Sequence, residues 1–124
     1  MLRIVVGGQI SKQDIYNFIE NYFGEGNVEL AIKNDLDAAN ALKMGQYDYY
    51  VGACNTGGGG ALALAIAIVG FDNCKTVSMP GKIFPDEEII GAVNDGKTAF
   101  GFTAQHIEQV LPILLKAMKE KKGE

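Results

Sequence analysis

The chain has 124 residues, of which 48% are hydrophobic, so it holds enough apolar material for one core and we expect a single domain over residues 1–124. The formal net charge of −4 argues against nucleic acid or an anionic membrane surface as the main partner, because both attract basic surfaces. No apolar run approaches the roughly 18 residues of a membrane span.

The beginning of the chain, MLRIVVGGQ, is too short and too soon interrupted by glycine for a signal peptide. The two cysteines have no secretory context and, with the single histidine, no metal-ligand spacing. We therefore predict a cytoplasmic protein with reduced thiols, no bound metal and no cofactor.

Strand and helix patterns alternate along the chain, with a turn signal between each and the next. The patterns predict strands at 2–6, 28–33, 49–54, 75–79 and 98–102, and helices over 11–24, 34–45, 61–69, 85–96 and from 103 onward. Ser11, Asn34 or Asp35, and Thr103 are expected to cap helices, and Pro112 to kink the last helix or reset its start.

This regular alternation predicts an α/β fold: a three-layer sandwich in which a five-stranded parallel sheet carries helices on both faces, with right-handed crossovers, as in Rossmann-like and flavodoxin-like domains. The helix expected over 61–69 is apolar all round. Such a helix either packs deep inside the monomer or meets its copy in another chain. The second possibility predicts a homodimer.

The most informative stretch is residues 48–70, DYYVGACNTGGGGALALAIAIVG. Here a predicted apolar strand is followed by four consecutive glycines and then by a predicted helix. Glycines let the backbone turn tightly and approach a ligand closely. Asn55 or Thr56 suits the N-cap of the helix, whose first amides would be left unpaired. Such a turn favours an anion, although its spacing matches neither a P-loop nor a dinucleotide fingerprint.

Ligands of parallel sheets collect beyond the carboxyl ends of the strands. The residues expected there as ligand-binding candidates are Gly7, Gly8, Gln9, Asn34, Asn55, Thr56, Gly57, Gly58, Gly59, Gly60 and Lys82, and the catalytic candidates are Cys54, Thr56 and His106. Each has a plainer interpretation. The thiol of Cys54 is either a small buried side chain or a base, His106 is either a solvated helix-start residue or an acid/base, and Lys82 either holds a phosphate or decorates a loop.

The stretch YDYYVGACNTGGGGALALAIAIVG, with IKND and LDAA before it and KTAFG after it, resembles the YhfU-like bacterial family of unknown function over nearly the whole chain. That resemblance implies no activity.

A second resemblance is local. Residues 54–59 are similar to the Cys-Gly-Thr-Gly-x-Gly turn of type B ribose phosphate isomerases and their galactose-phosphate relatives. In that family the cysteine moves a proton and the threonine and glycine amides hold an enediolate oxygen, roles that the resemblance would give to Cys54, Thr56, Gly57 and Gly59. The Asp-His pair of those enzymes is replaced here by Gly7, Gly8 and Gln9.

Two hypotheses follow. The first is a binding domain for a small anionic metabolite, phosphorylated or carboxylated and including sugar phosphates. The second is a sugar-phosphate isomerase with Cys54 as base. A thiolate phosphocarrier resembling subunits of sugar transport systems is a weaker third possibility, because the cysteine of those subunits follows the first strand.

Overall fold

A computed structural model of the chain describes residues 1–55 and 58–123. Its main sheet has five parallel strands in the order β2-β1-β3-β7-β4. The strands are β1 (Arg3–Gly8), β2 (Glu29–Ile32), β3 (Tyr49–Cys54), β4 (Cys74–Thr76) and β7 (Ala99–Thr103). The predicted parallel α/β sheet is confirmed.

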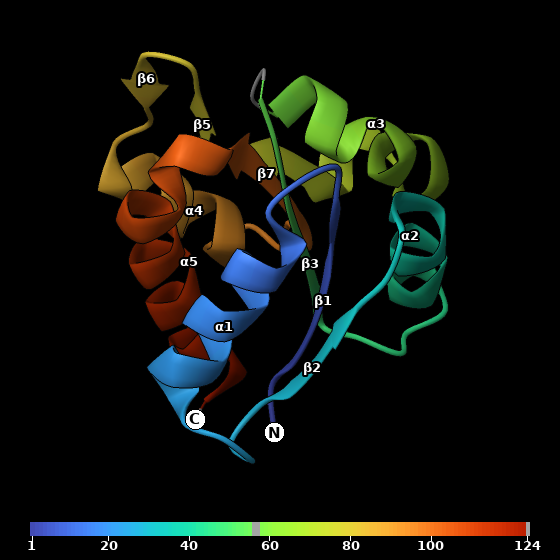
Figure 1. Cartoon of the computed structure of the whole chain (residues 1–124), viewed down its shortest axis with the longest axis vertical. Coiled ribbons are helices and arrows are strands. Elements are labelled where there is room, and N and C mark those ends of the chain that lie inside the picture. Colours follow the sequence, from blue (N-terminus) through green and yellow to red (C-terminus); the bar gives the residue numbers. More distant parts are fainter. Residues whose placement is uncertain (56–57, 124) are drawn as a thin grey trace.

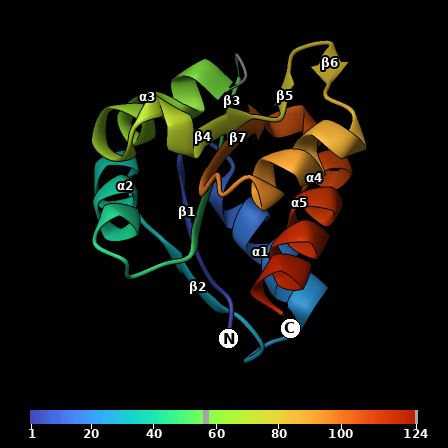
Figure 2. The ribbon, with the colours of Figure 1, turned by 180° about the vertical axis from the view of Figure 1, so that it is seen from behind.

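Helices cover both faces of this sheet (Figure 1). One face carries α2 (Asp35–Lys43) and α3 (Gly58–Val69), and the other carries α1 (Lys12–Phe23), α4 (Asp86–Asn94) and α5 (Ile107–Lys122). Two short 3₁₀ turns, η1 (Phe71–Asn73) and η2 (Ala104–His106), lead into β4 and α5. The view from behind shows the same three layers (Figure 2).

Successive side chains of the central strands point to opposite faces of the sheet, so the hydrophobic core has two parts, one on each face. Tyr49, Val51 and Ala53 pack in the cluster under α1, α4 and α5, whereas Tyr50 packs in the cluster under α2 and α3. All six residues of β3 are buried, as expected for a strand covered on both sides.

One prediction about the strands is wrong: residues 75–79 are not one strand. The parallel strand β4 ends at Thr76, and β5 (Ser78–Met79) pairs antiparallel with β6 (Lys82–Ile83) in a separate two-stranded sheet. Beyond Thr76 the chain remains joined to β7 by the Val77 N–H, which donates to the Gly101 carbonyl at 2.9 Å, and by the Ser78 side-chain oxygen, which accepts a hydrogen bond from the Thr103 N–H at 3.1 Å. The hairpin projects beyond the carboxyl ends of the strands (Figure 1).

The expected caps have mixed outcomes. Asn34 caps α2, since its Oδ1 accepts a hydrogen bond from the Asp37 N–H at 2.8 Å. Within the described residues Ser11 and Thr103 make no side-chain capping bond, and Ser11 adopts a left-handed backbone with φ of 57°. The helix α5 begins only at Ile107, after η2, and runs through Pro112.

The apolar helix α3 is not buried on every side of the monomer. Its inner face packs through Leu62 and Ala65, whereas Ala63, Leu64 and Ala67 are exposed, Leu64 by 40%. Of the two alternatives for this helix, burial deep inside one chain is therefore wrong, and contact with a second copy stays a prediction.

Candidate functional site

The carboxyl ends of β1 and β3 lie side by side, and the chain leaves them toward opposite faces of the sheet. From β1 it continues into α1 on one face, and from β3 into α3 on the other. A reversal of this kind opens a crevice at the carboxyl edge, which is where doubly wound sheets bind ligands. The candidate site is therefore this edge (Figure 1).

A row of glycines crosses the three central strands just before this edge. Gly7, Gly52 and Gly101 are in register across β1, β3 and β7. A Cβ on Gly7 would lie 2.5 Å from the Tyr50 ring, and one on Gly52 would lie 2.8 Å from Gly8 Cα. Glycine is needed at position 7 so that the Tyr50 ring can lie against the sheet, and at position 52 so that the backbone of Gly8 can come close.

Tyr50 fills the space over this row. Its hydroxyl accepts a hydrogen bond from the Gly8 N–H and donates one to the Ala61 carbonyl in the first turn of α3, both at 2.9 Å. Burial raises the pKa of the phenol well above its ordinary value, so Tyr50 is neutral at physiological pH. The N–H of Gly8, a predicted ligand contact, is thus already used by Tyr50.

Cys54 lies at the end of β3 and is only 1% exposed. A Cβ on Gly60 would lie 3.4 Å from the Cys54 sulfur and 3.1 Å from Oε1 of Gln9, so the first turn of α3 sits over both side chains. Neither Cys54 nor Cys74 is in a disulfide. Of the predicted site residues, the structure brings Gln9, Cys54 and Gly60 together.

Thr103 was expected at the carboxyl end of the last strand and as a helix cap; it lies at that end of β7, and within the described residues its side chain makes no capping bond. It pairs in register with Cys54 and, by alternation with Phe102, lies on the α3 side of the sheet. The residue is 2% exposed, and its Oγ1 has no hydrogen-bond partner within the described residues. An unsatisfied buried hydroxyl costs roughly 1–3 kcal/mol, so it requires an explanation.

A second buried oxygen without a hydrogen-bond partner in the described part of the chain lies at the start of α2. Oδ1 of Asp35 is buried without a partner in the described part of the chain. Burial raises the pKa of Asp35, and the nearby charge of Lys12 lowers it in part. Asp35 also acts electrostatically on Tyr50, which raises the pKa of the phenol further.

The remaining predicted residues lie at the same edge but in different settings. Asn34 is occupied as the α2 cap, whereas Asn55 is exposed. Lys82 lies on the exposed hairpin with its Nζ 4.7 Å from the centre of the Phe84 ring. His106 ends η2, and its buried Nδ1 has no partner among the described residues.

Thr56 and Gly57 lie outside the described residues. Gly58, Gly59 and Gly60 are the first residues of α3. Their amides have no acceptor within the helix, because the first four N–H groups of any helix precede its hydrogen-bond pattern.

The described residues hold no cluster of three or more histidine, cysteine or acidic side chains that could bind a metal ion. Within the same residues, no helix is long and apolar enough to cross a membrane.

The fold and this edge define a doubly wound α/β domain with a glycine-lined switch point. Residues 2–118 match the family described as protein of unknown function DUF2620, and the chain belongs to that family. It is 41% identical over 119 residues to uncharacterized protein YhfU of Escherichia coli K12, covering 96% of this chain and all of that protein. The YhfU protein of Shigella flexneri is equally similar, with 41% identity over the same length. No solved structure matches the chain.

Proposed function

We propose that this chain binds a small anionic metabolite, phosphorylated or carboxylated, at the start of α3. The observation that carries the proposal is the buried Oγ1 of Thr103, which has no partner within the described residues and lies on the side of the sheet that α3 covers. The hydroxyl would donate a hydrogen bond to a phosphate or carboxylate oxygen above it and so gain a partner.

The charge distribution supports an anion at this position. The first turn of α3 has no acidic residue, whereas α2 begins with Asp35 and Asp37 and α4 with Asp86, Glu87 and Glu88. Acidic side chains compensate the positive end of a helix dipole. The start of α3 lacks this compensation, and an anionic ligand would supply it.

The exposed side chains of Gln9 and Asn55 would contact the same ligand from β1 and β3. Gly58, Gly59 and Gly60 would offer backbone amides without side chains in the way. Thr56, Gly57, Gly7, Gly8, Asn34 and Lys82 remain predicted contacts.

The first test replaces Thr103 by valine, which keeps the shape and removes the hydroxyl. We expect the free energy of unfolding without ligand to stay equal or rise by about 1 kcal/mol, because an unsatisfied polar group is lost. Affinity for inorganic phosphate or a phosphorylated sugar, measured by calorimetry, should fall roughly tenfold. Thr103→Ser keeps the hydroxyl and serves as control, and a valine variant that binds normally would contradict the proposal.

A second pair of variants tests the helix start. Gly60→Asp places a carboxylate at the start of α3, where an acidic residue suits the helix. Its Cβ would lie 3.1 Å from Gln9 Oε1, at the end of a side chain that can shift, so folding should survive while anion binding is lost. Gly91→Asp in α4, where an added Cβ meets nothing within 4 Å, is the comparison variant away from the site. Equal anion affinity in both variants would rule out the start of α3.

The alternative, a sugar-phosphate isomerase with Cys54 as base and His106 assisting, requires the thiol to reach a substrate carbon. Cys54 is 1% exposed and Thr103 is 2% exposed, so a ligand could reach either side chain only after the first turn of α3 moved, and burial alone does not separate the two hypotheses. Cys54→Ala separates the two: it should abolish isomerisation if the chain is an enzyme and leave ligand affinity nearly unchanged if it is a binding domain.

We also propose that two copies pair through the outer face of α3. All twelve residues of this helix are glycine or apolar, and Ala63, Leu64 and Ala67 are exposed on it. Small side chains let two helices approach closely, and an uncharged surface meets its own copy without repulsion. Sedimentation should show a dimer that Leu64→Glu dissociates. A monomer in the unmodified chain would contradict this.

A further inference from the structure

A polar groove lies on the opposite face of the sheet from α3, between α1 and the beginning of α5. It encloses about 430 Å³. Its walls carry six polar side chains, and we call it the amide groove: Asp14, Asn17, Asn21, Gln105, Glu108 and Gln109.

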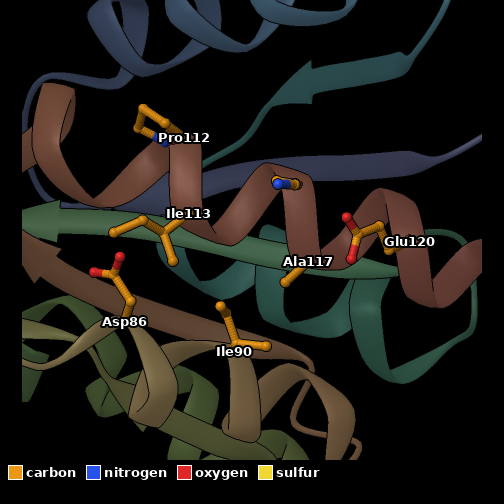
Figure 3. A pocket seen from close by; sticks show the side chains of 7 residues that line it. Asp86, Ile90, Pro112, Ile113, Ala117 and Glu120 are labelled. Carbon is orange, nitrogen blue, oxygen red and sulfur yellow. The ribbon is translucent and has the colours of Figure 1, made fainter.

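The polar side chains of the amide groove are exposed and are mostly amides. Four of the six polar side chains are amides, two are carboxylates, and none of the lining residues is basic, although the chain contains 11 lysines and arginines. The hollow between α4 and α5 is different, because a basic residue, Lys116, lines it together with two acidic ones. Figure 3 labels the acidic residues, Asp86 and Glu120.

The wall residues point into one groove because of helix geometry. Asp14, Asn17 and Asn21 are spaced by three and four residues and so share one face of α1. Within the described residues, only Asn17 among the six has a side-chain hydrogen bond, which its Oδ1 accepts from Gln13 at 2.9 Å. The amide groove therefore offers many donors and acceptors to a ligand.

The floor of the groove is apolar. Phe18, Ala104 and Ile107 line it and are partly buried against the main core. The amide groove thus joins a hydrophobic floor, including an aromatic ring, to hydrogen-bonding walls.

We propose that the amide groove binds a neutral polyhydroxylated ligand, a sugar or sugar alcohol. Neighbouring hydroxyls each donate and accept a hydrogen bond, and a side-chain amide can do both at once. The C–H face of such a ligand fits the apolar floor. Two carboxylates without a basic partner disfavour anions, so this ligand differs from the one proposed at α3.

The test uses NMR of the isotope-labelled full chain, because side-chain amide groups give their own signals. Glucose, galactose, mannitol and glucitol are titrated separately, with inorganic phosphate and calcium chloride as comparison probes. We expect at least one of the four polyols to shift the amide signals of Asn17, Asn21, Gln105 and Gln109, and phosphate to leave them unchanged.

Variants then establish which residues bind. Asn21→Leu and Gln109→Leu should each weaken binding of the polyol about tenfold, whereas Asn40→Leu, on the exposed surface of α2, should not change it. Thr103→Val should also leave polyol binding intact, which separates this proposal from the anion site. Failure of all four polyols to shift the groove amides, equal weakening by Asn40→Leu, or a response to calcium alone would overturn the proposal.

Discussion

Tyr50 joins two segments that are far apart in sequence, the end of β1 and the first turn of α3. Its hydroxyl bonds to both backbones, and its ring occupies the space left by Gly7. The aromatic content of residues 49–54 predicts a buried strand, and burial of both tyrosines is confirmed. Tyr49 and Tyr50 point to opposite faces of the sheet. Only the packing of the helices on those faces decided that Tyr50 is the one that contacts α3.

We predict that Tyr50→Phe lowers the free energy of unfolding by about 1–3 kcal/mol, because the Gly8 N–H and the Ala61 carbonyl both lose a buried partner. Urea denaturation measures the change. Tyr16→Phe, at a half-exposed position of α1, is the control and should change stability little. Similar effects of the two substitutions would show that the hydrogen bonds of the Tyr50 hydroxyl contribute nothing to stability.

At the amino ends of the strands, Asp48 links three elements of the fold. Its carboxylate accepts hydrogen bonds from the Arg3 backbone N–H at 2.9 Å and from the Arg3 guanidinium at 3.0 Å, and lies 3.3 Å from Lys122 Nζ. This arrangement connects the beginnings of β1 and β3 with the end of α5. Burial raises the pKa of Asp48, but the hydrogen bonds from Arg3 and Lys122 outweigh it and hold the pKa below the ordinary value of 3.8.

A lowered pKa in the folded state means that ionised Asp48 stabilises the fold. This stability is present above the unfolded value near 3.8 and is lost as the pH falls through the lower folded value. We therefore expect Asp48→Asn to reduce the free energy of unfolding by about 1–2 kcal/mol at neutral pH, and the difference to shrink below pH 4. Denaturation of both proteins across pH 3–7 measures it. A difference independent of pH would contradict this account.

For the whole molecule, the strand order predicts where stability is concentrated. The strands β1, β3 and β7 have a neighbour on both sides, whereas β2 and β4 are edges and β5 and β6 form a separate small sheet. A two-stranded hairpin is marginally stable alone.

We expect amide hydrogen exchange to be slowest in the three inner strands, intermediate in β2 and β4, and fastest in the β5–β6 hairpin, because local opening follows buried contacts. Exchange measured by mass spectrometry or NMR tests the order. Protection of the hairpin equal to that of β3 would show that it is part of the main cooperative unit.

The candidate site was predictable in part. Four consecutive glycines after a buried strand indicated the edge at which polar residues meet, and Gln9, Cys54 and Gly60 do lie together there. The burial of the Thr103 hydroxyl without a partner among the described residues was not predictable, because it depends on the pairing of β7 with β3, which places residue 103 beside residue 54.

What the amino-acid order determined by itself is the alternation of strands and helices, and hence a parallel sheet with two covered faces, because hydrophobic periodicity and turn residues are local properties. Tertiary structure alone decided the order of the strands, the departure of Ser78 and Met79 into a hairpin, and the exposure of one side of α3. These features depend on contacts between segments distant in sequence, whose relative free energies no local pattern records.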